Sequence, residues 1–247
     1  MVGDQRGLQF GSIAEQYDAY RPAPPDVAIE LLGDSVDKEI LEVGAGTGLW
    51  TRFLVAHGAT VTAVEPDVDM LAILKRRSPI VRALSGSAEA LPADDESFDA
   101  VLVSSAWHWF RQPDATTEMA RVLRDEGLLF VLWNGFSRDV PWVESLTELR
   151  ESPSDEHRQP RGWSADFSSE GPFTLVREVE CRWIWPRTID QLVALFGTYS
   201  GAIVRSVSDR RAMEEQLRSR LVGHVHHGVV DVAMTIRGTI GRRTARD

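Results

Sequence analysis

The strongest constraint on the fold is an alternation of short apolar runs with segments of helical periodicity between residues 38 and 134. The apolar runs are rich in β-branched residues, which is typical of strands buried on both faces. The segments between them carry helix signals, such as an aspartate before the first turn. This order predicts a parallel sheet with helices on both faces. The expected strands are 39–43, 59–66, one at the start of 80–92, 98–106 and 128–134, and the expected helices are 49–57, 67–77 and 114–127.

The pattern changes after residue 134. Residues 135–172 are polar and irregular, with one short helical stretch in 142–151, and such a long insert in a compact domain favours a lid. The final strand alternates in polarity, which suits an antiparallel strand at an edge of the sheet. We therefore expect an α/β, Rossmann-like fold with a seven-stranded, mostly parallel sheet and an antiparallel strand near the C-terminus. The later elements expected are strands 173–185 and 229–240 and helices 188–199 and 209–222.

Composition narrows the function classes. The 247 residues carry a net charge of −10, which disfavours a nucleic-acid partner because phosphate binding needs a basic face. The basic C-terminus, "RGTIGRRTARD", is interpreted as a solvated tail. The single cysteine, Cys181, allows no intrachain disulfide and suits a reducing compartment. Neither a signal peptide nor a run of 18 apolar residues is evident, so we expect a cytoplasmic protein with no membrane partner.

The stretch "LEVGAGTGLW" (41–50) places Gly44, Gly46 and Gly48 on alternate positions between a strand and a helix. A glycine turn of this kind offers free backbone N–H groups to a polar ligand and lets that ligand approach the main chain. Glu65 lies 21 residues after Gly44, at the end of the second strand, where a carboxylate can accept hydrogen bonds from ribose hydroxyls. The combination predicts a nucleoside site.

Alternatives remain for the ligand. The dinucleotide fingerprint is G-x-G-x-x-G, whereas the spacing here is G-x-G-x-G, and no G-K-[ST] follows as a P-loop requires. A nicotinamide-dependent oxidoreductase on a related fold stays open as an alternative, as does a plain tight turn. A cofactor-binding protein without catalysis, acting as a sensor or partner subunit, is a third possibility.

Four segments carry a family resemblance: "ILEVGAGTGLWT", "VTAVEPDVDML", "GSAEALPADDESFDAVLVSSAWHWF" and "ARVLRDEGLLFVLWN". They resemble the successive motifs of class I S-adenosylmethionine-dependent methyltransferases of the small-molecule branch, the methyltransferase type 11 domain. That branch opens with F-x-x-x-A-x-x-Y-x-x-Y-R-P, matched here by residues from Phe10 to Pro22. The resemblance covers residues 8 to 135 and reaches the last third only in outline. It implies one domain with a flap (8–37), a cofactor-binding core (38–134), a lid or mobile insert (135–172) and C-terminal strands with substrate-side helices (173–247).

By that resemblance the cofactor is S-adenosyl-L-methionine and the acceptor is a small molecule. The loop residues would pass the methionine part, Glu65 would take the ribose, and Tyr17 and Arg21 would contact the cofactor from the flap. Ser87 departs from the family, which often has aspartate there. The implied cofactor contacts are Tyr17, Arg21, Glu42, Gly44, Ala45, Gly46, Gly48, Glu65, Pro66, Asp67, Met70, Ser87, Ala88, Glu89, Ser104 and Ser105.

His108 is the candidate general base, because it follows the fourth strand at the carboxyl edge of the sheet and histidine titrates near neutral pH. The alternative is that His108 forms an inert wall of the pocket. The "HVHH" segment (224–227) lacks a companion carboxylate or cysteine at ligand spacing, so no metal site is expected. Trp183 and Trp185 share one face of a predicted strand, and core packing is favoured over a flat wall for an acceptor.

Overall fold

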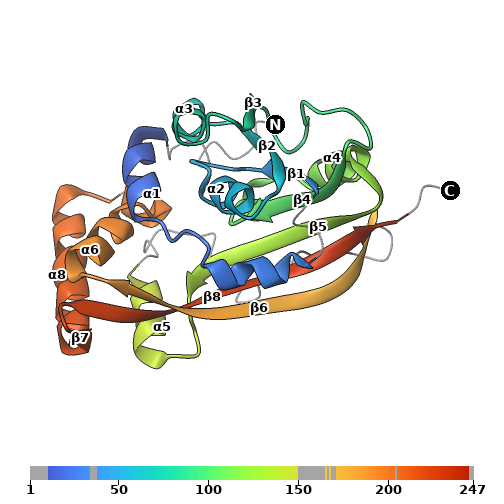
Figure 1. The fold of residues 1–247 in the computed structure, drawn as a ribbon. Helices are drawn as coiled ribbons and strands as arrows, with labels where there is room; N and C mark the ends of the chain where they lie inside the picture. The colour runs from blue at the N-terminus through green and yellow to red at the C-terminus, as the bar shows by residue number, and fades with distance from the viewer. Residues whose placement is uncertain are drawn as a thin grey trace.

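A computed structural model describes residues 11–33, 38–149, 165, 167, 171–203 and 205–244. Its centre is one twisted sheet with the order β3-β2-β1-β4-β5-β8-β6, and the short β7 pairs with β8 (Figure 1). The first five strands in this order are parallel, and β8 runs antiparallel to both of its neighbours. The mixed, mostly parallel α/β fold is therefore confirmed. The strands are β1 (Glu39–Val43), β2 (Thr60–Glu65), β3 (Arg82–Ser85), β4 (Phe98–Ser104), β5 (Leu123–Phe136), β6 (Phe173–Arg187), β7 (Val225–His226) and β8 (Val229–Arg243).

Helices cover both faces of the sheet. One face of β1, β4 and β5 packs on Trp50, Phe53 and Leu54 of α2, and the other packs on Met119 and its neighbours in α4. These contacts explain why the strands are apolar on both sides. The helices are α1 (Ala14–Tyr20), η2 (Asp26–Leu31), α2 (Leu49–Ala56), α3 (Val68–Arg77), η4 (Trp107–Trp109), α4 (Asp114–Val122), α5 (Pro141–Glu148), α6 (Ile189–Gly197), α7 (Ser200–Ile203), α8 (Val207–Leu221) and η5 (Val222–His224).

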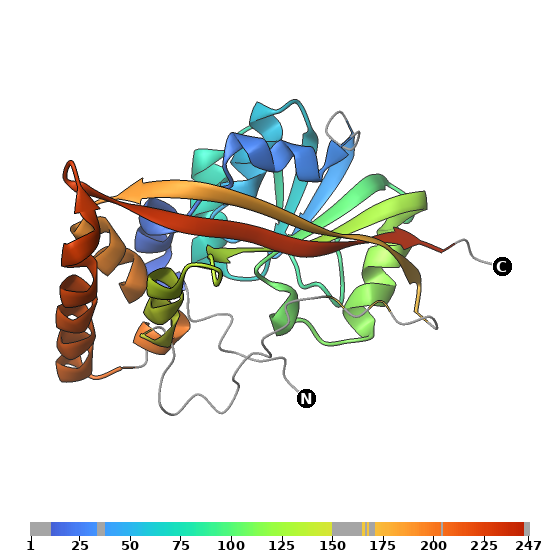
Figure 2. The ribbon, with the colours of Figure 1, turned by 90° about the horizontal axis from the view of Figure 1, so that it is seen from below.

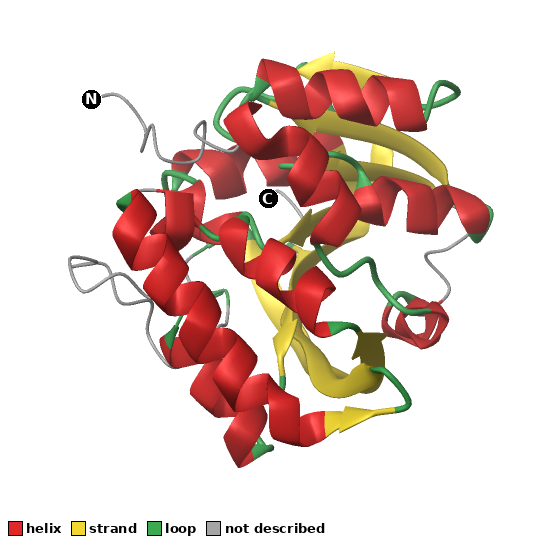
Figure 3. Cartoon of the chain, turned by 90° about the vertical axis from the view of Figure 1, so that its left-hand side faces the viewer, coloured by secondary structure: helices red, strands yellow, loops and turns green. Residues whose placement is uncertain are grey.

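A second, separate core lies at one end of the sheet. β6 and β8 extend past the other strands, and Figure 2 shows this long pair reaching the side where α6 and α8 lie. Phe136, Trp185, Phe196 and Met234 are among the buried residues that join α5, α6 and α8 to the strand pair. This helical end faces the viewer in Figure 3. α1 packs between it and the parallel half of the sheet, since α1 contacts both α3 and α6.

The predicted edge position of the last strand was wrong. β8 lies between β5 and β6, and β6 is the edge strand. The alternation in polarity was misleading because the small and polar residues of β8 are themselves buried, including Thr235 and Thr239. At Gly238 an added Cβ would lie 2.1 Å from the carbonyl oxygen of Val131, so a neighbouring strand fills that space.

Two further boundaries differ from the sequence prediction. The helix expected over 114–127 ends at Val122, and β5 already begins at Leu123. The basic C-terminus is not a solvated tail up to Arg243, because β8 continues to that residue and its side chain is only 2% exposed. Arg243 donates hydrogen bonds to the Leu123 carbonyl oxygen and to Glu96, so paired acceptors compensate its burial. Residues 245–247 lie outside the described part.

The segment boundaries of the predicted domain organisation stay predictions. In the insert, the helical stretch is present as α5, which begins with proline at its first position. Residues 150–164, 166 and 168–170 lie outside the description, as do residues 8–10 and 34–37 of the expected flap. Within the described chain, no helix has both the length and the apolar character that crossing a bilayer requires.

Candidate cofactor site

The glycine turn joins β1 to α2 at the carboxyl edge of the sheet. Its backbone N–H groups are largely used inside the protein: Gly44 and Ala45 donate to the Val64 carbonyl oxygen at 2.9 and 3.1 Å, and Gly48 donates to Ala45 at 2.9 Å. Gly46 donates to the Glu65 carboxylate at 2.8 Å. The expectation of a row of free donors was therefore wrong. The turn is held rigid by its own hydrogen bonds, and a ligand would meet its Cα surface.

The glycines have different reasons to lack a side chain. A Cβ on Gly44 would lie 2.7 Å from the Ala106 Cβ and 3.3 Å from Phe110, so packing against the segment after β4 requires glycine. Gly46 has a φ of +57°, and a Cβ there would have no heavy atom within 4 Å. Gly46 therefore borders open space, and it is the position at which a ligand can pass close to the main chain.

Glu65 stands beside that space. It ends β2, is only 7% exposed, and accepts hydrogen bonds from the N–H groups of Gly46 and Asp67 at 2.8 and 2.9 Å. Burial raises its pKa from 4.5 to about 7, and the two backbone hydrogen bonds oppose that rise. The carboxyl group is thus fixed in direction, and a small change in its surroundings at neutral pH alters its charge.

Glu42 lies on β1 in the same region but points into the protein. Its carboxylate accepts a hydrogen bond from the Thr51 hydroxyl of α2, and the residue is 3% exposed. Burial raises its pKa to about 8, and the charge of Glu65 adds to the rise. Its observed partner is internal, so a contact between Glu42 and a cofactor stays a prediction.

α1 covers the site. Tyr17 packs with Ala14, Met70 and Ile73, which places the predicted flap against the predicted adenine-side residue of α3. Burial raises the pKa of the Tyr17 hydroxyl, the Arg21 guanidinium opposes that rise, and the charges of Glu65 and Glu42 add to it. The N-terminus of α3 is fixed by Asp67, which accepts hydrogen bonds from the N–H groups of Asp69 and Met70.

Arg21 is tied to the far end of the chain rather than to the glycine turn. Its guanidinium donates to the hydroxyl and carbonyl oxygens of Thr198, both at 2.9 Å. The described contacts therefore join the flap to α6. A contact of Arg21 with a cofactor stays a prediction.

Two functional candidates were missed in the sequence. Asp18, whose side chain is 5% exposed, pairs with Arg52 of α2 at 2.7 Å and with Arg77 of α3 at 3.1 Å. Arg52 also donates to the carbonyl oxygen of Thr47 inside the glycine turn at 2.9 Å. The flap is thereby connected to the turn through one arginine. An acid beside Tyr17 in "YDAYRP" was the available signal, but its partners are 34 and 59 residues away.

The predicted adenine contacts occupy several environments. Ala88 is 4% exposed and belongs to the core beneath β4, whereas Pro66 is exposed. Glu89 accepts a hydrogen bond from the Arg111 N–H at 2.7 Å, which links the loop after β3 to the segment after η4. Ser87 is half-buried and forms an isolated bridge with Ala90. Their contacts with adenine stay predictions.

The segment after β4 carries the candidate catalytic residues. Ser104 is half-buried, and Ser105 has a φ of +55°, which is unusual for a residue other than glycine. The Ser105 N–H donates to the Leu132 carbonyl oxygen at 2.8 Å and so holds the end of β4 against β5. His108 lies on η4, is exposed, and its ring centroid is 4.6 Å from that of Trp109. The structure places it at the expected edge of the sheet but leaves its role untested.

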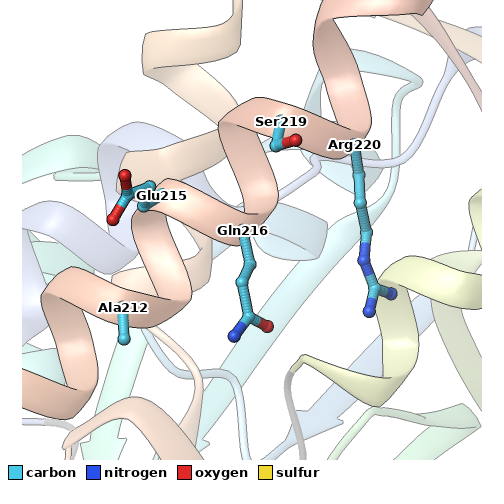
Figure 4. A pocket seen from close by; sticks show the side chains of 5 residues that line it. All are labelled: Ala212, Glu215, Gln216, Ser219 and Arg220. Carbon is cyan, nitrogen blue, oxygen red and sulfur yellow. The ribbon is translucent and has the colours of Figure 1, made fainter.

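Other motifs find structural explanations. Trp183 and Trp185 share one face of β6, and their ring centroids lie 6.1 Å apart. Both pack in the core of the helical end. His224 stacks on Trp142 at 4.1 Å, and no three potential metal ligands come together among the residues described. A shallow, open pocket of about 440 Å³ lies against exposed residues of α8 (Figure 4). Its lining residues, Ala212, Glu215, Gln216, Ser219 and Arg220, come from α8 and none belongs to the cofactor region.

Comparison with known proteins decides the family. The methyltransferase domain family matches residues 41–131, which contain the glycine turn and β2. An uncharacterised methyltransferase of Mycobacterium tuberculosis is 36% identical over 217 residues, covering 88% of this chain and 87% of the relative. The chain belongs to the class I S-adenosylmethionine-dependent methyltransferases. It is therefore an enzyme of methyl transfer.

Two further proteins are similar to this chain. The demethylmenaquinone methyltransferase of Renibacterium salmoninarum is 28% identical over 194 residues, which cover 74% of this chain and 78% of that protein. A solved structure assigned as a type II methyltransferase from Anaeromyxobacter dehalogenans superposes with a TM-score of 0.62 at 20% identity, covering 90% of this chain and 97% of the other. The second likeness shows that the fold is shared over 90% of this chain.

Proposed function

We propose that this methyltransferase binds S-adenosyl-L-methionine over the glycine turn and transfers its methyl group to a small-molecule acceptor. One observation gives the main support for the cofactor assignment. The open space at Gly46 lies beside the carboxylate of Glu65, which accepts a hydrogen bond from the Gly46 N–H at 2.8 Å. A carboxylate so placed suits the two hydroxyls of a ribose. The family to which the chain belongs supports the same cofactor.

The chain's own residues would supply alignment and exclusion of water. S-adenosylmethionine provides an electrophilic methyl group on a positively charged sulfur. Glu65 and the turn around Gly46 would hold the nucleoside end, while Tyr17 on α1 would close the site from above. Ser104 and Ser105, at the end of β4, border the region in which the acceptor would meet the methyl group in line.

The acceptor side supports a small molecule. α1, which carries Tyr17, contacts α6 of the last third of the chain, and the net charge of −10 disfavours nucleic acid. The relative named as a demethylmenaquinone methyltransferase also acts on a small molecule by its name. His108 is proposed as the general base for an acceptor that arrives protonated. We place the enzyme in the cytoplasm, a proposal supported by the single cysteine.

Isothermal titration tests the proposal directly. Purified full-length protein is titrated with S-adenosylmethionine, S-adenosylhomocysteine and, separately, NADH. We expect both sulfur nucleosides to bind with micromolar affinity and NADH not to bind. Binding of NADH alone would favour the alternative of a nicotinamide-dependent oxidoreductase. Binding of none of the three compounds would refute the cofactor assignment.

A separate variant tests the base. His108→Gln should lower turnover on any acceptor that the enzyme methylates by roughly 100-fold, the lower end of the usual contribution of a general base, with cofactor affinity unchanged. Unchanged turnover would make His108 a wall of the pocket.

A further inference from the structure

α1 is attached to α6 through one arginine. Arg21 follows α1, and its Nε and Nη2 donate to the hydroxyl and carbonyl oxygens of Thr198, each at 2.9 Å. Thr198 is the residue at which α6 ends, and its hydroxyl donates in turn to the Leu195 carbonyl oxygen at 2.6 Å. A cation at the C-terminus of a helix satisfies a carbonyl group and interacts favourably with the helix dipole. The position of Arg21 is thus set by the end of α6.

Two tyrosines hold the same guanidinium from the sides. The Arg21 Cζ lies 4.1 Å from the ring centroid of Tyr199 and 4.8 Å from that of Tyr17. Thr198 and Tyr199 are 1% and 7% exposed, so their part of this contact is rigidly packed. The described partners of Arg21 are neutral groups of Thr198, Tyr199 and Tyr17. We call Arg21, Thr198 and Tyr199 the flap clasp.

The clasp bears on the cofactor site through Tyr17. That ring lies against the guanidinium on one side and packs on Met70 and Ile73 of α3 on the other. Burial raises the pKa of its hydroxyl, the Arg21 guanidinium lowers it, and the charge of Glu65 adds to the rise. A shift of Arg21 would therefore move a tyrosine that packs on Met70, a residue of the predicted adenine side.

We propose that Thr198 and Tyr199 are positioning residues for cofactor binding, because they hold Arg21 and, through it, the Tyr17 side chain and its hydroxyl at the predicted cofactor site. A helix of the last third of the chain then sets the affinity of a site built from the first third. The inference rests on the proposed function, since it assumes that the cofactor occupies the space between Gly46 and Tyr17.

The test measures S-adenosylhomocysteine affinity by isothermal titration of the full-length protein. Thr198→Val removes the hydroxyl acceptor and should weaken binding roughly tenfold, the loss expected for one hydrogen bond to a charged group. Thr198→Ser keeps the hydroxyl and should restore wild-type affinity. Thr147→Val is the matched control, because the Thr147 hydroxyl also donates to a carbonyl oxygen three residues back but meets no arginine in the described structure.

A double-mutant cycle separates positioning from a general loss of structure. Tyr17→Phe removes the hydroxyl and keeps the ring, so Thr198→Val should cost much less affinity in that background than in the wild type. If Thr198→Val does not fold, Arg21→Lys breaks the two-pronged contact from the other side and should give the same pattern. Equal losses in both backgrounds, or wild-type affinity in the Val variant, would overturn the positioning role. Absence of binding by the wild-type protein would instead refute the proposed function, and the two failures are therefore distinct.

Discussion

Glu42→Gln should stabilise the enzyme, and by more as the pH rises. Burial raises the pKa of Glu42 from 4.5 to about 8, so the folded protein keeps this carboxyl group protonated at neutral pH. The unfolded chain releases the proton near pH 4.5. Folded protein therefore binds more protons than unfolded protein between these values, and its stability falls with pH across that window.

The size of the effect follows from the same shift. Each pH unit within the window costs up to about 1.4 kcal/mol, so the full penalty above pH 8 is roughly 5 kcal/mol. Glutamine has the shape of the protonated glutamate and can still accept the hydrogen bond from Thr51, but it carries no charge at any pH. From pH 5.5 to 7.5 the stability of Glu42→Gln relative to wild type should rise by roughly 2 to 3 kcal/mol.

Urea unfolding at pH 5.5, 6.5 and 7.5 measures this difference. Glu214→Gln, the same change on the exposed side of α8, serves as the control for removing one carboxyl group from the unfolded chain. If wild type and Glu42→Gln keep a constant stability difference across the series, Glu42 ionises in the folded protein as readily as in the unfolded chain. Burial would then not raise the pKa of Glu42.

Three further outcomes are expected around the glycine turn. Glu65→Ala should weaken S-adenosylhomocysteine binding at least roughly tenfold by calorimetry, and unchanged affinity would remove Glu65 from the ribose contact. Ribose hydroxyls favour the ionised form of Glu65, whose pKa is about 7. Cofactor binding at pH 6.5 should therefore release protons, and the binding affinity should rise with pH up to about 7. Titrations in buffers of different ionisation enthalpy measure this release and would show none if Glu65 were uninvolved. Gly46→Ala should lower the free energy of unfolding by only about 1 kcal/mol yet weaken cofactor binding, whereas Gly44→Ala should lower the free energy of unfolding by roughly 2 to 3 kcal/mol. Thermal melts in which Gly46→Ala is the less stable of the two variants would contradict the packing around Gly44.

Local signals in the sequence predicted much of the parallel half of the sheet. The runs at 39–43 and 98–106 are apolar because helices cover both of their faces, and the pattern registers that burial directly. The position of Glu65 at the end of β2 was also predictable, because the length of one strand–helix–strand unit fixes its distance from the turn. These features depend on neighbours along the chain.

The remaining features depend on contacts between distant segments. β8 enters the sheet between β5 and β6 because its glycines and threonines fit against neighbouring strands, and polarity alone does not report that fit. The pairing of Asp18 with Arg52 and that of Arg21 with Thr198 join residues 34 and 177 positions apart. A single sequence marks such residues as polar helix positions and contains no signal for their partners.

The three alternate glycines show why a motif must be taken apart residue by residue. Gly44 is required by the Ala106 side chain, and Gly48 by Leu74, whose Cγ would lie 3.0 Å from an added Cβ. Neither requirement involves a ligand, and either could arise in any tight strand-to-helix turn. Only Gly46 combines open space with a neighbouring carboxylate. Gly46 and Glu65 therefore give the most direct support for a ligand, while Gly44, whose φ is +70°, needs glycine for its backbone as well as for its packing. Contacts of Gly44 and Gly48 with the cofactor stay predictions.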